Sequence, residues 1–169
     1  MSTENESPDA RGLSASAARV MAELRRLGAS GEVRELADST RTARDAAAAL
    51  RCEPAQIVKS LVFRDLDRDR PLLVLICGVD RVDESKLADL VGAAVAQAPA
   101  AFVRDRTGSA IGGVPPVGHR EAIEVHVDEG VMAHERLWAA AGTPRAVFPT
   151  TGAELLRLTG GRLGSLAEG

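Results

Sequence analysis

Two apolar segments joined by a short polar turn limit the folds that this chain can adopt. The first segment, "IVKSLVFR" at 57–64, is β-branched and apolar and predicts a strand. The second, "LLVLICG" at 72–78, predicts another strand, and the turn "DLDRDRP" connects the two. The pair is therefore expected to form an antiparallel hairpin. A hairpin excludes a simple alternating βαβ winding, and we expect a single α+β domain.

Apolar spacing and capping residues predict helices around this hairpin. Thr42 with Asp45, and Thr151 with Glu154, have the spacing of helix N-caps, and Asp83 is expected to cap a further helix. The expected helices cover Ser14 to Leu27, "TARDAAAALR", Asp83 to Val91, Pro99 to near Gly108, about 131–141, and Thr151 to the glycines at 160–161.

Further strands are expected at 32–37, at "AAVAQA", at "AIEVHVD" and at 145–148. In "AIEVHVD" the alternation predicts that Ile123, Val125 and Val127 point inward and that Glu124 and His126 face solvent. No repeat or linker divides the chain. We expect a disordered tail at 1–12 and one domain at 13–169, with a mixed, curved, barrel-like sheet and flanking helices.

Composition excludes several classes of function. The net charge of −3 gives no global basic field for nucleic acid, and four aromatic residues without tyrosine argue against a base-stacking platform. No apolar run is long enough for a membrane helix, and the polar N-terminus does not resemble a signal peptide, so a cytoplasmic protein with no membrane or DNA partner is expected. Cys52 and Cys77 are expected to be reduced, mostly buried thiols.

Lys59 stands out because lysine occurs only twice among 21 basic residues, at Lys59 and Lys86. Alternation places Lys59 on the same strand face as Leu61 and Phe63. It can be an edge-strand lysine that reaches water, which is a common device against aggregation. It can also line a pocket and aim its ammonium group at an anionic or carbonyl oxygen.

The stretch "IGGVPPVGHR" at 111–120 combines glycines with prolines. Gly112 and Gly113 allow the backbone to approach a ligand closely, while Pro115 and Pro116 fix the dihedral angles beyond them. The loop is either a structural turn or a rigid backbone edge that holds a reacting group.

His119 follows that loop and is either a general base or a polar loop residue. No set of histidines, cysteines and carboxylates has metal-ligand spacing, so we expect no catalytic metal and no cofactor.

Four segments in order resemble the YbaK / prolyl-tRNA-synthetase-associated editing family. They are "TARDAAAALRCEPAQIVKSLVF", "GVDRVDESKLADLVG", "GSAIGGVPPVGH" and "PRAVFPTTGAELLRLTGG", and the resemblance covers about residues 18 to 162. It implies a mixed, barrel-like sheet and a freestanding aminoacyl-tRNA deacylase that acts on the 3′ end of mischarged tRNA. tRNA-Pro is one candidate substrate, and an aminoacyl-tRNA synthetase is a candidate partner.

The family's two hallmarks are a lysine that ends a "QIVK" strand and a G-x-x-x-P loop, which correspond here to Lys59 and to Gly112–Pro116. The resemblance implies catalytic roles for Lys59, Gly112 and Gly113. It implies substrate contacts by Ser60, Thr42, Val114, Pro115, Pro116, Gly118 and His119. Family members usually have glycine where this chain has Arg51, which affects the cap of the helix that ends there.

Two other functions are compatible with the same residues. One is a module that binds a tRNA end or a synthetase without turnover. The other is a small-molecule binding or structural protein. A basic patch beside the pocket, from Arg25, Arg26, Arg104 or Arg106, would favour tRNA binding, whereas a neutral rim would favour the small-molecule alternative.

Overall fold

The computed structural model of the chain describes residues 12–38, 40 and 42–169, so most of the tail expected at 1–12 lies outside the described residues. Its α-helices are α1 (Ala15–Arg26), α2 (Ala43–Leu50), α3 (Glu84–Val91), α4 (Ala100–Thr107) and α5 (Gly152–Thr159). Its strands are β1 (Arg34–Glu35), β2 (Val58–Asp65), β3 (Arg70–Cys77), β4 (Val95–Gln97), β5 (Glu124–Asp128), β6 (Leu137–Ala140), β7 (Ala146–Thr150) and β8 (Arg162–Gly164). Two short 3₁₀ helices are η2 (Pro54–Gln56) and η3 (Glu129–Ala133).

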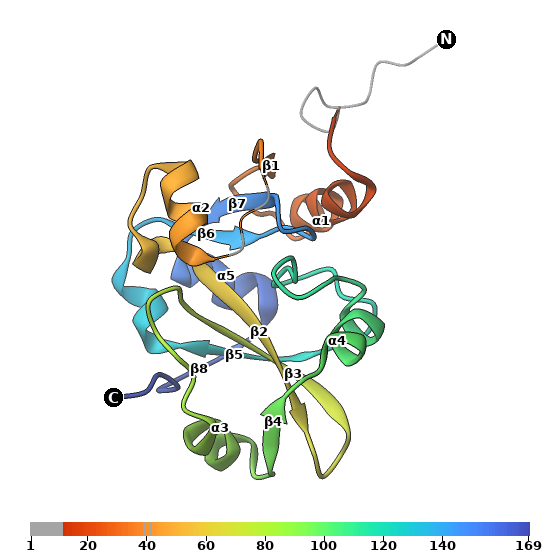
Figure 1. Ribbon diagram of the computed structural model, residues 1–169, viewed down its shortest axis with the longest axis vertical. Coiled ribbons are helices and arrows are strands. Elements are labelled where there is room, and N and C mark those ends of the chain that lie inside the picture. Colours follow the sequence, from red (N-terminus) through yellow and green to blue (C-terminus); the bar gives the residue numbers. More distant parts are fainter. Residues whose placement is uncertain (1–11, 39, 41) are drawn as a thin grey trace.

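The strands form two sheets. The larger has the order β4-β2-β3-β5-β8, with β2 antiparallel to β3 and β4, and β5 parallel to β3 and β8. The smaller has the antiparallel order β1-β7-β6. Figure 1 shows β2 running from beside β6 and β7 toward β4 at the other end of the molecule. The α+β class, the hairpin and the mixed sheet are confirmed, but the strands are not closed into the barrel-like sheet that was expected.

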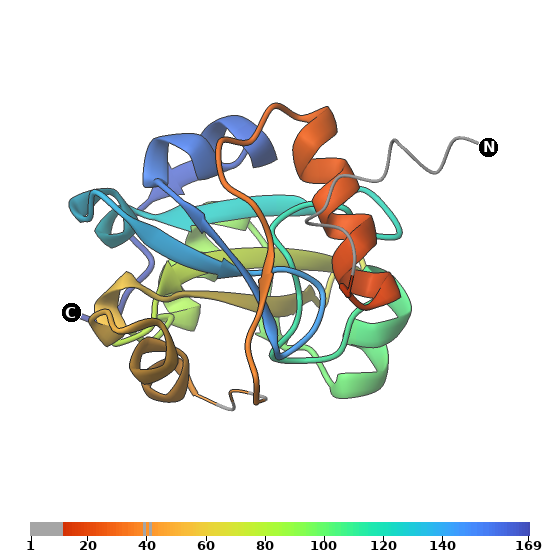
Figure 2. The same cartoon turned by 90° about the horizontal axis from the view of Figure 1, so that it is seen from above.

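A single bridge between Ile57 and Trp138 joins the two sheets within the described residues. Beyond this bridge no further pairing joins β2 to β6 within the described residues. In the view from above, α2 and α4 lie on one side of the molecule and α1 and α5 on the other (Figure 2). The candidate site lies at this seam, where the two sheets are joined by a single bridge.

The expected helix caps are present. The side chains of Thr42, Asp83 and Thr151 each accept a hydrogen bond from the first turn of their helix. Arg51 takes the left-handed conformation, with φ +56°, at the C-cap of α2. The helix therefore has the left-handed ending that usually contains glycine, although the residue here is arginine.

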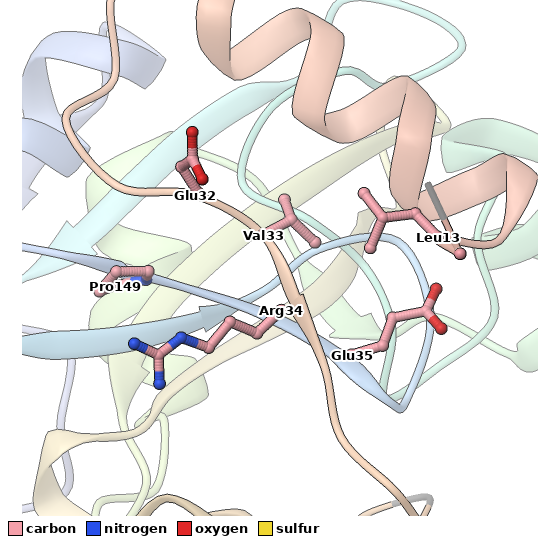
Figure 3. Close-up of a pocket in the computed structure, with 7 residues that line it drawn as sticks. Leu13, Glu32, Val33, Arg34, Glu35 and Pro149 are labelled. Atoms are coloured by element: carbon pink, nitrogen blue, oxygen red, sulfur yellow. The ribbon is translucent and has the colours of Figure 1, made fainter. Parts of the chain in front are cut away.

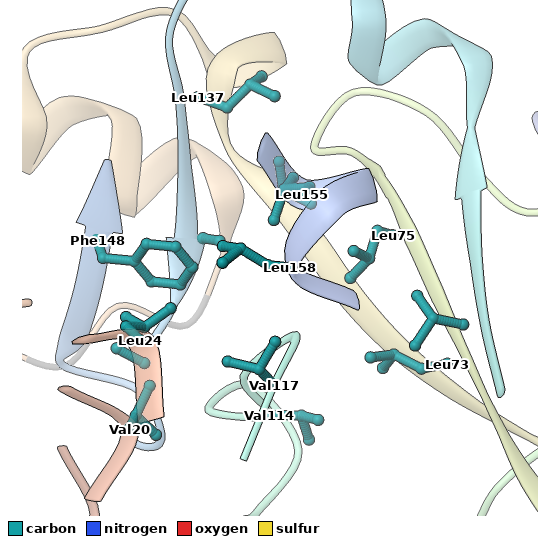
Figure 4. Packing of buried hydrophobic residues seen from close by; sticks show 14 of the residues in the cluster. Val20, Leu24, Leu73, Leu75, Val114, Val117, Leu137, Phe148, Leu155 and Leu158 are labelled. Atoms are coloured by element: carbon teal, nitrogen blue, oxygen red, sulfur yellow. The ribbon is translucent and has the colours of Figure 1, made fainter. Parts of the chain in front are cut away.

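The main core lies between the two sheets, α1 and α5. Figure 4 shows side chains from β3, β7, α1 and α5 converging there, with Val114 and Val117 of the glycine–proline loop packed into the same cluster. A second core on the other face of the five-stranded sheet packs Phe63 and Val74 against Leu87 of α3 and Leu166 near the C-terminus. β3 is therefore buried on both faces, which explains its unbroken apolar run.

Burial of both faces also corrects one prediction. His126 is 2 % exposed and does not face solvent. It lies opposite Val74 in the β3–β5 ladder, on the face that α3 and the C-terminal segment cover. Its Nε2 lies 2.9 Å from a carboxylate oxygen of Glu124. The alternation was read correctly, but solvent was assigned to a face that another layer of the fold covers.

The helix expected at about 131–141 is also wrong. The chain forms η3 and then β6, which pairs with β7. The alanines of "LWAAAG" favour a helix locally, but hairpin pairing and burial between the sheets outweigh that preference. The short strand β8 was not predicted, and Pro99 is the N-cap of α4 rather than a residue of its first turn.

A buried carboxylate holds the turn of the β2–β3 hairpin. Asp65 is fully buried and accepts hydrogen bonds from the backbone of Asp67 and Arg68 and from the side chains of Arg68 and Arg70. Although burial acts to raise the pKa of Asp65, these hydrogen bonds lower it to about 2. Asp65 therefore stays ionised and keeps the hairpin register fixed.

Candidate active site between the two sheets

A cavity of about 490 Å³ opens where β2 and β6 separate. Its walls come from β2, β6, β7, α2, α4 and the glycine–proline loop. Most of the lining side chains are apolar, among them Val58, Val62, Val103, Val114 and Trp138. The polar lining residues are Thr40, Thr42, Lys59, Ser60, Gln97 and Thr143. The volume lies within the range of about 300–1,000 Å³ that is typical of small-ligand sites.

Lys59 is the one charged residue among the described residues that line this cavity, and none of them is an aspartate, glutamate, histidine or cysteine. The described lining therefore has one cationic side chain and no side-chain carboxylate or imidazole that could act as a general base.

Lys59 is half-buried, and its ammonium group donates a hydrogen bond to the main-chain carbonyl of Asp80, in the turn after β3. Burial lowers the pKa of Lys59 from its ordinary value, and the Asp80 carboxylate opposes that effect. Lys59 and Gly112 line the same cavity, as expected, but the ammonium group is bonded to the turn after β3 and not to the loop. Lys59 shares its strand face with Leu61 and Phe63, as alternation predicted.

Ser60 lines the cavity from the opposite face of β2. Its hydroxyl is buried and is the one side-chain polar atom among the described residues that is buried without a hydrogen-bond partner. A buried hydroxyl without a partner costs about 1–3 kcal/mol, so such groups are uncommon unless a ligand completes them. Because this oxygen has almost no accessible surface, Ser60 lines the cavity through its other atoms.

The two glycines of the loop differ in their environment. Gly112 has φ +92° and lines the cavity, with open space where a Cβ would stand and no hydrogen bond from its peptide groups to another described residue. Gly113 donates to Ala110 and accepts from Gly142, both at 2.9 Å, and a Cβ there would lie 2.7 Å from the Cα of Thr143. Gly112 can therefore offer its backbone to a ligand, while Gly113 fastens the loop to the β6–β7 turn.

Val114 lines the cavity, whereas the buried prolines Pro115 and Pro116 lie behind the lining. They can stiffen the loop, but they are not placed to contact a ligand in the cavity. Pro116, Gly118 and His119 instead line a separate hollow beside α1 and α5. The structure thus gathers Lys59, Ser60, Thr42, Gly112 and Val114 around one cavity and leaves the end of the loop outside it.

His119 holds the loop from that other side. Its Nε2 lies 2.6 Å from the carbonyl oxygen of Pro115, which can only accept, so Nε2 carries the proton in this contact. Burial lowers the pKa of His119, and the bond to Pro115 acts in the opposite direction. A neutral imidazole in this place supports the loop and is not placed to deprotonate water in the cavity.

The cavity mouth includes residues that sequence reasoning did not single out. Thr40 donates its backbone and hydroxyl hydrogen bonds to the carbonyl of Pro144, and Thr143 accepts from the backbone of Arg145 and Ala146. The motif "GTPR" indicates a turn, but nothing local to it indicates contact with the glycine loop about 30 positions earlier in the chain. Thr42 lines the same mouth, where its hydroxyl is already used as the helix cap.

Most arginines of the expected basic patch are paired with carboxylates. Arg25 pairs with Glu32 and Arg26 with Glu23, while Arg106 lies near three carboxylates. Three of the four expected residues are thus neutralised, and Arg104 has no ion pair with a described residue.

Two other arginines lie next to the lining residues. The Arg34 guanidinium lies 5.1 Å from the ring centroid of Trp138, and Arg145 Nε donates to the Leu36 carbonyl. Neither has an ion-pair partner among the described residues.

A further hollow lies beside β1, lined by Glu32, Val33, Arg34, Glu35 and Pro149 among others (Figure 3). Arg34 and Glu35 leave β1 in different directions, and the Glu35 carboxylate accepts a hydrogen bond from the backbone of Ser14. Three of the seven residues that line this hollow are charged, and the hollow flanks a two-residue edge strand. It contains none of the residues expected at the site.

Both cysteines are free, Cys77 buried and Cys52 half-buried. Burial raises the pKa of the Cys77 thiol to about 11, which makes it a poor nucleophile near neutral pH. Among the described residues, no helix combines the length and the apolar character needed to cross a bilayer.

The family model of the aminoacyl-tRNA editing domain matches residues 37–158 of the sequence, which include α2, β2 and the glycine–proline loop. The chain belongs to the aminoacyl-tRNA editing domain family. The crystal structure of a candidate trans-editing enzyme for prolyl-tRNA synthetase is 47 % identical and superposes with a TM-score of 0.88, over 93 % of this chain and 99 % of that one.

Two other members extend the likeness. The crystal structure of the hypothetical protein APE2540 is 28 % identical, with a TM-score of 0.83 over 89 % of this chain and 99 % of that one. The uncharacterised protein YwhH of Bacillus subtilis (strain 168) is 28 % identical over 124 residues, which is 73 % of this chain and 78 % of YwhH. The fold and the family resemblance are thereby confirmed, and membership of the editing family indicates a role in aminoacyl-tRNA editing.

Proposed function

We propose that the chain is an aminoacyl-tRNA deacylase that acts in trans on mischarged tRNA. The observation that carries this proposal is the cavity between the sheets, where one cationic side chain and the open backbone of Gly112 share an otherwise apolar wall. In the reaction, water adds to the ester carbonyl, the bond to the terminal ribose oxygen breaks, and a proton from water ends on that oxygen. The products are the free amino acid and uncharged tRNA.

Editing is needed because a synthetase pocket discriminates a missing methylene by only about 1–3 kcal/mol. The deacylase cavity suits an ester of a small, uncharged amino acid, since its lining is apolar and contains no described acidic residue. Ile111 is 59 % exposed beside Gly112 at the mouth. It offers an apolar surface on which the terminal base can rest.

The catalytic roles follow from charge and position. Lys59 supplies positive charge toward the developing oxyanion or the tRNA end, and the Gly112 backbone orients the carbonyl or the water. Ser60 lines the cavity beside them. Because the described lining has no general base, proton transfer is assigned to the substrate. The ribose hydroxyl next to the ester accepts the proton from water and passes its own proton to the departing ribose oxygen. In a cysteinyl ester the side-chain thiolate takes the proton from water and then delivers it to that oxygen.

tRNA binding is proposed at the arginines beside the mouth. Arg34 is opposite Val147 in the β1–β7 ladder, and Arg145 lies between two lining residues, so both are next to the cavity. Exposed guanidinium groups without carboxylate partners are suited to phosphate contacts. The relative described as a candidate trans-editing enzyme for prolyl-tRNA synthetase favours tRNA-Pro as the substrate and that synthetase as a partner.

A panel of mischarged tRNAs tests the proposal. The purified chain is incubated in single-turnover conditions with tRNA-Pro and with other tRNAs, each carrying a small or a large amino acid, and release of the amino acid is followed. Selective release from one or more of the small-residue esters is the expected result. Binding of tRNA without release from any of them would instead identify a non-catalytic tRNA-end module, and absence of both would contradict the tRNA assignment.

A further inference from the structure

The outer edge of β2 contains a gap at Ser60. The Gly78 N–H donates to the Ile57 carbonyl at 2.7 Å, which fixes the alternation of the β2–β3 ladder. Residues 59, 61 and 63 consequently exchange backbone hydrogen bonds with β3, while residues 58, 60 and 62 turn their N–H and C=O groups away from it.

Pairing is present on either side of Ser60 along that outer edge. The Val62 carbonyl accepts from the Ala98 N–H at 3.1 Å, and the Ile57–Trp138 bridge lies beside Val58. Between these two points no described strand pairs with β2, because β4 begins its pairing at Phe63 and β6 forms only the Ile57–Trp138 bridge. Ser60 therefore lies in an uncovered part of the edge, in the wall of the cavity.

A second observation concerns the same residue. The Ser60 hydroxyl is buried without a partner, although Ser60 lines the cavity. The hydroxyl oxygen has almost no accessible surface, so the backbone edge, which lacks one pairing step, is the polar part of Ser60 that can meet a ligand. A ligand that completes this step needs a donor and an acceptor about one residue apart, which an amino acid provides.

We propose that the Ser60 peptide binds the amino-acid part of the substrate as a one-residue extension of the sheet. The Ser60 N–H donates to the ester carbonyl oxygen, and the Ser60 C=O accepts from the α-ammonium group. This inference rests on the proposed deacylase function and adds to it the group that recognises the α-amino ester, whichever side chain that ester carries.

The same contact contributes to the reaction. When the oxygen of water adds to the carbonyl carbon, the π electrons move to the carbonyl oxygen, which the Ser60 N–H already faces. Collapse of this intermediate breaks the bond to the ribose oxygen, which receives the proton that water has lost. A fixed backbone donor of this kind is worth about 10²–10³ in rate.

Ser60→Pro and Ser60→Ala separate the backbone from the side chain. Proline removes the N–H, and proline is tolerated on a strand edge whose N–H makes no ladder bond. Alanine keeps the N–H and removes the hydroxyl. With mischarged tRNA that the wild-type protein hydrolyses, Ser60→Pro should lose about 100-fold or more in single-turnover rate and Ser60→Ala less than about tenfold. A folded Ser60→Pro variant with a rate within about threefold of Ser60→Ala overturns the inference.

Amide exchange tests the same contact in the unmodified protein, so it does not depend on the folding of a variant. In the free protein the Ser60 N–H should exchange faster than the Leu61 N–H, which lies in the ladder. An adenosine that carries the amino acid through a non-hydrolysable 3′-amide should slow exchange at Ser60 at least about tenfold and leave Leu61 unchanged. Slower exchange at Gly112 with no change at Ser60 would overturn the inference alone, whereas an inactive wild-type protein that does not bind this analogue would contradict the deacylase function itself.

Discussion

Lys59 donates its ammonium hydrogen bond to the main-chain carbonyl of Asp80 and not to the glycine loop across the cavity. The contact holds the amine at the wall, where burial lowers its pKa. Lys59 has no ion pair with another described residue, so under the proposed function a substrate oxygen competes with one neutral carbonyl for its ammonium group.

Lys59→Ala should reduce the single-turnover deacylation rate by about 10²–10³-fold, because a positive charge near the oxyanion is lost. Lys86→Ala is the matched control, since Lys86 also donates to a backbone carbonyl, that of Ala167, but does not line the cavity. The control should keep the wild-type rate. Equal rates for wild type and Lys59→Ala would remove the lysine from the mechanism.

Gly112→Ala should damage activity more than stability. Both Gly112 and Gly92 have positive φ and open space at the Cβ position, so alanine costs each about 1 kcal/mol in the free energy of unfolding. Only Gly112 lines the cavity, and only its substitution should lower the deacylation rate, by about tenfold or more. Urea unfolding and single-turnover assays of the two variants check this, and an equal rate loss in Gly92→Ala would point to a general effect of strain.

Arg34→Gln and Arg145→Gln should weaken tRNA binding without slowing the chemical step. Each loss of a phosphate contact should reduce the slope of log K against log salt by about 0.7–0.9. Arg162→Gln on β8, at the other end of the sheet order from β4, is the control and should leave the slope unchanged. Fluorescence anisotropy measures tRNA binding by each variant at salt concentrations from about 50 to 200 mM. The slopes of the three variants are then compared with that of the wild type. Unchanged slopes in both mouth variants would place the tRNA elsewhere.

His119 should make stability depend on pH near neutrality. Its pKa in the folded protein is lowered below the ordinary 6.5, so the unfolded chain takes up the proton first as the pH falls. The stability that the neutral imidazole provides is complete above pH 6.5 and is lost as the pH falls through the lowered pKa. His119→Gln, which can still donate to Pro115, should lose less stability than wild type from about pH 7.5 to 5.5 in urea titrations. Parallel losses would contradict this origin.

Asp65→Asn should lower the free energy of unfolding by about 2 kcal/mol, because several hydrogen bonds to a charged, buried acceptor are weakened. Since the pKa of Asp65 falls from 3.8 to about 2 on folding, its stabilising effect is complete above pH 3.8 and is lost as the pH falls to about 2. The exposed Asp89→Asn is the control, with an expected change below about 0.5 kcal/mol. Thermal and urea unfolding of both variants at neutral and acidic pH measure these changes. Equal losses of stability in the two variants would contradict the prediction.

Local signals in the sequence located most elements of the fold. Thr42, Asp83 and Thr151 are capping residues whose role depends on the next three or four positions, and the structure has all three as caps. The β2–β3 hairpin was equally local. Where the preference of a segment and its tertiary surroundings disagree, as in "LWAAAG", the surroundings decide.

The residues of the candidate site could be predicted only in part from local signals in the sequence. Lys59 stood out because lysine is rare in this chain, and Gly112 because its loop combines glycines with prolines, but their catalytic roles were expected only from the family resemblance. The exclusion of His119 from the cavity and the engagement of Gly113 with Gly142 could not be read from sequence. Both depend on which side of the loop packs against α1, α5 and the β6–β7 turn.

By itself the sequence determined the α+β class, the helix caps, the hairpin and the residues that are candidates for chemistry. These features depend on neighbours within a few positions along the chain. Only the tertiary structure decided that the sheets meet at Ile57 and Trp138 and then part, and that Ser60 faces the resulting opening. It also decided that His126 is covered. The reason is that burial and strand edges are set by packing between segments far apart in the chain, and no local pattern encodes which layers will cover which face.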